Sequence, residues 1–232
     1  NKSKRFINVK YSELINFYGV IFLYKDILQG ISNDVEGIVF KNFPDHPDVF
    51  DYDLKPYADS IIKKHGMEEW KSAILTNEMH GHLGIYSILG VKMGILAREY
   101  FNAKIDEIEV YSFAGNLPPF SCMNDGLQVS TGATLGRGTI HIIDTKPPSP
   151  HAIFVHNNNV IMIKLKKYFE DKIKSEISNS VAKYGLDDVS YWNYVRYIAI
   201  KYWYELDRRN IFDIIPMNIN DLQQYHIRRT NN

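Results

Sequence analysis

The sequence EMHGHLGIYSILGVKMGILA, residues 78–97, places two histidines directly before an apolar helical stretch. From Ile85 to Phe101 the apolar side chains recur every three or four residues, which predicts an amphipathic helix. Gly90 and Gly94 are four residues apart and therefore lie on one face of that helix, where another backbone can approach closely. We interpret this face as a packing surface.

The two histidines before the helix, His80 and His82, are separated by one residue. In a regular helix such side chains point about 200° apart, so they can share one ligand only if the backbone is irregular there. Gly81 and Gly84 permit an irregular turn. The spacing therefore predicts a turn leading into the helix, with metal binding or catalysis as the functional interpretation.

The only cysteine, Cys122, lies in PPFSCMNDGLQVSTG, residues 118–132, where a proline-bounded loop becomes a short helix ending at Gly132. Asp125 follows three residues later on the same helical face, as a partner that orients a histidine or as a proton acceptor. We expect the helix dipole to lower the pKa of the thiol. Imidazoles and a thiolate together suit zinc. The alternative is that Cys122 is an ordinary buried cysteine.

Composition limits the classes of partner. The chain has 232 residues, with 27 Lys plus Arg and 27 Asp plus Glu, so no net charge attracts a nucleic acid or a membrane surface. The apolar runs at 14–24 and 85–97 are too short to span a bilayer, and the second contains Lys92. The sequence starts without methionine, so a removed targeting segment would not be visible; we expect a cytoplasmic protein.

The remaining periodicities predict an α+β fold with a small mixed or antiparallel sheet packed with helices. Strands are expected where β-branched and aromatic residues concentrate, at 107–114, 138–144, 151–155 and 159–165. Further helices are expected at 7–28, 55–64, 67–78, 166–185 and 190–210. This divides the chain into a helical N-terminal extension (1–70), an α+β core (71–165) and an aromatic-rich helical tail (166–232). We expect the tail to pack on the core or on a dimer partner, with pocket lining as the alternative.

The glycine-rich segment STGATLGRGTIHI, residues 130–142, does not fit a phosphate-binding loop, because no Lys-Ser/Thr pair follows the glycines and a strand comes next. We keep only the hypothesis that Arg137 meets an anionic ligand.

Together, the histidine and cysteine segments resemble the FmdE family of formylmethanofuran dehydrogenase components over about residues 73–165. The quoted pieces are EMHGHLGIYSILGVKMGILA and PPFSCMNDGLQVSTGATLGRGTIHIID. Many members carry further cysteines at the positions of Gly84 and Ala133, and many end in a zinc ribbon; this sequence has none of these.

The resemblance implies an α+β core that dimerises and a metal, zinc, in a cleft. By analogy His80, His82 and Cys122 form the metal or active-site group, with Asp125, Gln128 and Thr131 lining the same cleft; we add Glu78 and Arg137 as further lining residues.

We therefore expect a zinc-binding accessory component of a one-carbon or redox metalloenzyme system, as a homodimer within a larger oxidoreductase complex. The alternative is a stand-alone zinc-dependent enzyme that activates water on a small molecule, with Cys122 and Asp125 as catalytic residues and Asp125 or Glu78 moving the proton. A third hypothesis is a structural module with packed histidines and cysteine. The substrate is not indicated.

Overall fold

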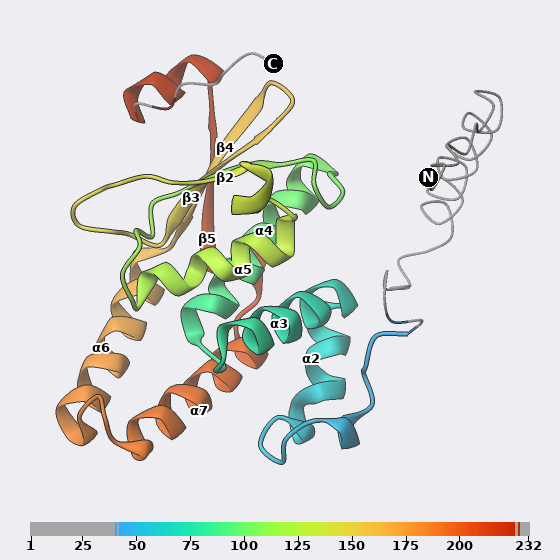
Figure 1. Cartoon of the computed structure of the whole chain (residues 1–232), viewed down its shortest axis with the longest axis vertical. Helices are drawn as coiled ribbons and strands as arrows, with labels where there is room; N and C mark the ends of the chain where they lie inside the picture. The colour runs from blue at the N-terminus through green and yellow to red at the C-terminus, as the bar shows by residue number, and fades with distance from the viewer. Residues whose placement is uncertain (1–39, 41, 226, 228–232) are drawn as a thin grey trace, which may run out of the picture. The chain divides into compact units, whose positions relative to one another are not determined.

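The computed structural model describes residue 40, residues 42–225 and residue 227 (Figure 1). The chain divides into two compact units, residues 1–43 and 44–232. The helix expected at 7–28 lies outside the described residues. All helices and strands named below belong to the second unit.

The order of helices and strands matches most of the expected pattern. The helices are α2 (Ala58–His65), α3 (Met67–His80), α4 (Ile85–Phe101), α5 (Met123–Thr131), α6 (Lys167–Tyr184), α7 (Val189–Glu205) and α8 (Arg208–Ile211), with short 3₁₀ turns η1 (Pro47–Val49), η2 (Lys55–Tyr57), η3 (Phe120–Cys122), η4 (Leu135–Arg137) and η5 (Ile219–Tyr225). The strands are β1 (Glu109–Ser112), β2 (Ile140–Ile142), β3 (His151–His156), β4 (Asn159–Leu165) and β5 (Phe212–Met217). The expected α+β class is confirmed.

The strands of the described residues form a five-stranded sheet in the order β2-β1-β3-β4-β5. β1 and β2 are parallel, whereas the other neighbouring strands are antiparallel, which makes the sheet mixed. β5 was not predicted from the sequence, since it contains Pro216 and follows a helix directly. Proline is tolerated there because β5 is an edge strand, where one side of the backbone needs no partner.

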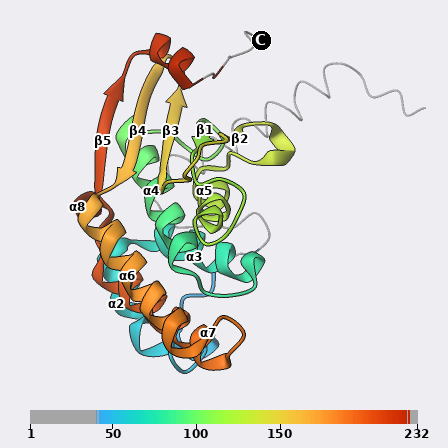
Figure 2. The same cartoon turned by 90° about the vertical axis from the view of Figure 1, so that its left-hand side faces the viewer.

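Both faces of the sheet are covered. On one face Val110, Phe154 and Ile161 lie opposite one another on adjacent strands, fully buried, and β4 contacts α4. On the other face η5 packs over a cluster that includes Tyr111 and Ile153. α6 and α7 lie beyond one end of the sheet (Figures 1 and 2).

Helices α4 and α5 approach each other closely in the core, and glycines lie at their contact. A Cβ on Gly90 would lie 2.1 Å from the carbonyl oxygen of Met123, and one on Gly126 would lie 2.1 Å from that of Ser87. A Cβ on Gly94 would lie 2.0 Å from Oγ of Ser130. The predicted role of Gly90 and Gly94 in packing is therefore confirmed, with α5 as the neighbour.

A buried ionic network connects α3, α4 and α8. Nζ of Lys92 donates to Oε1 of Glu69 at 2.6 Å, and both side chains are fully buried. Nη1 of Arg208 donates to Oε2 of Glu69 at 3.0 Å, and its other nitrogens bind Glu99. The apolar run containing Lys92 is thus a buried helix. No helix within residues 42–225 has the length and apolar character needed to cross a membrane.

The first prediction concerns this network. Glu69→Ala leaves the Lys92 ammonium buried without a counter-charge, so the free energy of unfolding should fall by about 3–5 kcal/mol. The matched control is Glu68→Ala, which removes a partly exposed pair with Arg98 and should cost about 1 kcal/mol or less. Urea unfolding followed by circular dichroism measures both; equal losses would show that the network contributes nothing beyond a surface pair.

The second prediction concerns the glycine contact. Gly90→Ala places a methyl group against the rigid backbone of Met123, so α4 and α5 must separate and stability should fall by about 2–3 kcal/mol. Gly136→Ala is the control, because the nearest atom to its Cβ, Oγ1 of Thr134, is 3.9 Å away. Thermal unfolding compares the two, and an unchanged melting temperature for Gly90→Ala would refute the close contact.

Candidate functional site

The histidine segment forms the turn between α3 and α4, as its spacing predicts. α3 ends at His80, and Gly81 takes the left-handed conformation with φ 80° and ψ 0°. The side chain of Asn77 fixes the turn, since its Oδ1 accepts hydrogen bonds from the Gly84 nitrogen at 3.1 Å and from Oγ of Ser87 at 2.7 Å. The irregular backbone therefore sends the two imidazoles to different surroundings.

His80 is held by a carboxylate from α5. Its Nδ1 lies 2.7 Å from Oδ2 of Asp125, which accepts the hydrogen bond. The other ring nitrogen, Nε2, is buried and has no hydrogen-bond partner among the described residues. Histidines that ligate metals commonly donate their second nitrogen to a carboxylate in this way, which fixes the tautomer and leaves the free nitrogen as the donor to the metal.

His80 and Cys122 share a cavity of about 340 Å³, which we call the His80 cavity. Its lining comprises His80, Asn116, Pro118, Ser121, Cys122, Asn124, Asp125, Gln128, Leu135, Ile140 and Ile142. These residues come from the end of α3, the loop before η3, η3 itself, α5, η4 and β2. The predicted proximity of His80, Cys122, Asp125 and Gln128 is thus present around one cavity.

Cys122 lies at the end of η3, directly before α5, and is partly buried. Burial raises the pKa of the thiol above its ordinary value, and the charge of Asp125 raises that pKa further. The expectation of a lowered pKa was wrong. The helix dipole is a small effect compared with desolvation and a carboxylate three residues away.

His82 lines a second cavity, which we call the Glu78 cavity. Glu78 and Gly81 line the same cavity. The His82 ring packs against that of His80, with centroids 4.3 Å apart, and edge-on against Trp192 at 5.2 Å. Burial lowers the pKa of His82, and neighbouring His80 lowers it further.

Gly84 lies between the two imidazoles. A Cβ at this position would lie 3.4 Å from Nε2 of His82 and 3.7 Å from Nε2 of His80. A side chain at residue 84 would therefore project between the two nitrogens. This is the position at which the resemblance implies a further cysteine in many members.

The other predicted lining residues do not reach the His80 cavity. Thr131 is buried, with its Oγ1 donating to the carbonyl of Leu127 at 2.6 Å and accepting from the Ala133 nitrogen at 3.1 Å. Arg137 forms an ion pair with Asp106. Thr131 thus stabilises the C-terminal end of α5 through these hydrogen bonds. Glu78 lines the Glu78 cavity and not the His80 cavity.

Two positioning residues were not predicted from the sequence. Asn77 holds the histidine turn, and Asn124 connects α5 to the sheet, because its Oδ1 accepts from Oγ of Ser112 at 2.6 Å and its Nδ2 donates to the carbonyl of Gly115 at 2.9 Å. Asn124 could have been identified from its position between Cys122 and Asp125. Asn77 could not be identified from the sequence, because its partner Gly84 is seven residues away across the turn.

Within residues 42–225, no three side chains of His, Cys, Asp or Glu are grouped so that they could hold a metal ion. His80 and Cys122 both line the His80 cavity, and their Nε2 and Sγ atoms are the candidate donors. An imidazole and a thiol are the donor types that zinc prefers.

The third prediction concerns the Cys122 thiol. Because burial and Asp125 both disfavour the thiolate, Cys122 in the presence of EDTA should react with DTNB at about pH 7.5 several-fold more slowly than free cysteine. Asp125→Asn removes one cause and should accelerate the reaction, whereas Glu78→Gln, outside the His80 cavity, should not. The chain has no other cysteine, so the absorbance change reports Cys122 alone. A rate above that of free cysteine would indicate an activated thiolate.

Two comparisons place the chain among known proteins. The family model described as "FmdE, Molybdenum formylmethanofuran dehydrogenase operon" matches residues 79–203. A protein of Archaeoglobus fulgidus (strain ATCC 49558 / DSM 4304 / JCM 9628 / NBRC 100126 / VC-16), named "Probable S-adenosyl-L-methionine-binding protein", is 29% identical over 108 residues, which cover 40% of this chain and 29% of the relative. The chain thus spans less than a third of that relative. The family match covers more than half of the chain and includes both the histidine turn and the cysteine helix, so the chain belongs to the FmdE family.

Proposed function

We propose that the chain is a metal-binding protein of this family, with zinc held at the His80 cavity by Nε2 of His80 and Sγ of Cys122. One observation carries the proposal. The Nε2 atom of His80 is buried without a partner among the described residues, whereas Nδ1 of the same ring is held by Asp125 at 2.7 Å. A buried imidazole nitrogen without a hydrogen bond is costly unless a ligand satisfies it.

The chemistry of the donors supports a soft or borderline transition metal over magnesium or calcium, which prefer oxygen ligands. The thiol must lose its proton to bind the metal, and its raised pKa means that this proton leaves only when the metal arrives. Metal binding should therefore release a proton at neutral pH.

The remaining coordination positions are part of the proposal. His82 is the third ligand that the resemblance implies, and its Nε2 lies on the same side of the turn as that of His80, close to Gly84. A catalytic zinc site typically has three protein ligands and one open position. His82 completes such a set if its ring turns toward the His80 cavity; otherwise a bound molecule must supply the third donor.

Two roles follow from such a site. The leading proposal is an accessory component of a one-carbon or redox metalloenzyme system, since the family description refers to a formylmethanofuran dehydrogenase operon. We further propose that it acts as a homodimer within a larger oxidoreductase complex. The second is a stand-alone enzyme, which the size of the His80 cavity favours, since about 340 Å³ admits a small molecule. Zinc would supply Lewis acidity there. In that role Asp125 would orient His80 and hold the proton on Nδ1.

The fourth prediction tests the metal. Full-length protein purified without an affinity tag should contain about one zinc per chain by mass spectrometry of the metal. His80→Ala and Cys122→Ser should each weaken zinc affinity at least tenfold in a competition titration with a chromophoric chelator, and Asp125→Asn should weaken it about 10- to 100-fold because the ring loses its orientation. His46→Ala, at an exposed histidine of the loop before η1, is the control and should retain the metal.

Wild-type zinc content near zero after supplementation, or unchanged affinity in both His80→Ala and Cys122→Ser, would remove the proposal and favour the structural module. The relative's name suggests S-adenosyl-L-methionine as the first small molecule to titrate against the zinc-loaded protein. Sedimentation of the loaded protein tests the homodimer, and small-molecule turnover without a partner protein would favour the stand-alone enzyme.

A further inference from the structure

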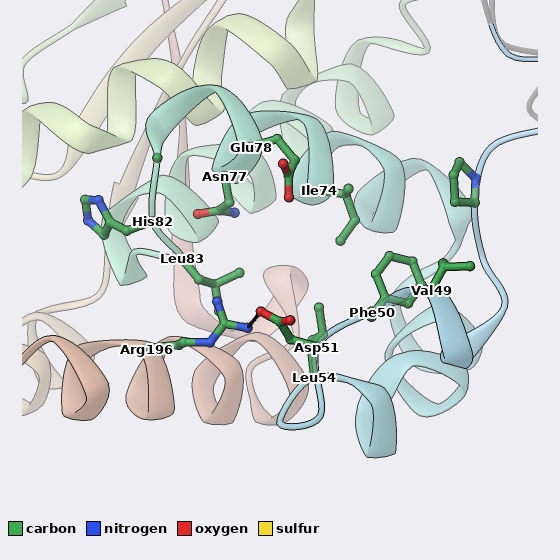
Figure 3. A pocket seen from close by; sticks show the side chains of 12 residues that line it. Val49, Phe50, Asp51, Leu54, Ile74, Asn77, Glu78, His82, Leu83 and Arg196 are labelled. Carbon is green, nitrogen blue, oxygen red and sulfur yellow. Dashed lines mark hydrogen bonds and ion pairs between the residues drawn. The ribbon is translucent and has the colours of Figure 1, made fainter.

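The Glu78 cavity has the size of a small-molecule site, and the family match does not account for it. Its volume is about 450 Å³, within the usual range for ligand pockets. Eight of its twelve lining residues precede residue 79, where the family match begins. It is therefore built mainly by the segment before α2 and by α3 (Figure 3).

One side of the cavity is an apolar wall formed by Val49, Phe50 and Ile74, which Figure 3 shows together. The wall is firmly supported. The Phe50 ring packs edge-on against buried Trp70 with centroids 4.9 Å apart, and Trp70 stacks on Trp203 at 5.0 Å. A preformed aromatic and aliphatic wall of this kind suits the hydrocarbon body of a ligand.

The charges around the cavity are unbalanced. The exposed Glu78 side chain directs its carboxylate into the cavity from α3, and the carboxylate makes no hydrogen bond or ion pair with any residue that the structure describes (Figure 3). Arg196 from α7 is the one lysine or arginine in the described lining, and Asp53 already holds it through two hydrogen bonds of 2.6 and 2.8 Å. Asp51 binds the same guanidinium at 3.2 Å. Two aspartates thus share one arginine, and Glu78 has no counter-charge among the described residues.

This arrangement selects the class of ligand. An anion would meet Glu78 and Asp51, with the guanidinium already engaged, so it is disfavoured. A bare metal ion is disfavoured as well, because no three suitable donors are grouped within the described residues. A monovalent organic cation satisfies both sides of the cavity, with its charged group at Glu78 and its apolar body against Phe50.

We propose that the Glu78 cavity binds a small primary ammonium compound with an aromatic or branched apolar body, as a site separate from the zinc site of the His80 cavity. The ammonium group donates to the Glu78 carboxylate, and charge-assisted hydrogen bonds of this type are the stronger ones in proteins. The hydrocarbon part lies against Val49, Phe50 and Ile74.

The experiment compares two probes of the same shape that differ in charge. Full-length protein in about 0.15 M salt, where exposed charges are largely screened, is titrated by calorimetry with 2-phenylethylammonium and with 2-phenylethanol. We expect the ammonium compound to bind at least about tenfold more tightly than the alcohol, a difference of about 1.4 kcal/mol.

Variants place the site. Glu78→Gln should bring the two probes to within about twofold of each other, whereas Asp187→Asn, which removes one exposed negative charge between α6 and α7, should leave the ratio unchanged. Ile74→Trp fills the cavity from the apolar side and should abolish binding of both probes. Thermal unfolding of each variant confirms that it folds.

Three outcomes would overturn the inference. The first is no saturable binding of the ammonium probe up to about 10 mM, a concentration above ordinary small-ligand dissociation constants. The others are equal affinity for both probes, or an unchanged ratio of the two affinities in Glu78→Gln. Zinc content measured in the same preparations separates this test from that of the proposed function. Glu78→Gln should retain the metal, and His80→Ala should retain the charge preference.

Discussion

The close approach of α4 and α5 is the constraint on which the rest of the structure depends. Gly90 and Gly126 face each other's helix backbones at distances that no larger residue permits. Because α4 begins immediately after the histidine turn and α5 begins immediately after Cys122, this one contact brings two segments about forty residues apart to the same cavity. The Asp125 hydrogen bond to His80 at 2.7 Å follows from it.

The ionic network supports the same helices from the other side. Glu69 of α3, Lys92 of α4 and Arg208 of α8 are buried together, so the C-terminal part of the chain is fixed to the two helices that flank the histidine turn. Burying three charges is costly, and their mutual hydrogen bonds offset that cost only in one arrangement. Arg208 thereby connects the C-terminal part of the chain to α3 and α4, and β5 extends the sheet immediately after α8.

Local signals in the sequence were sufficient for α2 to α7, the irregular turn and four strands, because periodicity and glycine position report backbone conformation directly. The single helix expected at 190–210 is divided, since α7 ends at Glu205 and α8 follows as a separate short helix. Local signals were not sufficient for β5, whose Pro216 argues against a strand unless its edge position is known. The direction of the shift in the Cys122 pKa could not be predicted from the sequence either, since it depends on burial and on the distance to Asp125. The Glu78 cavity could not be foreseen, because Val49, Phe50 and Arg196 meet only in three dimensions.

The His-Gly-His turn lies between the two cavities. His80 lines the His80 cavity and His82 lines the Glu78 cavity, and the two rings are in contact with centroids 4.3 Å apart. A ligand of the Glu78 cavity that displaces the His82 ring must therefore also move the His80 ring. Thermodynamic linkage makes such coupling reciprocal, so that each ligand changes the affinity of the other by the same factor. The contact between the two rings is therefore where coupling between the two proposed sites would act.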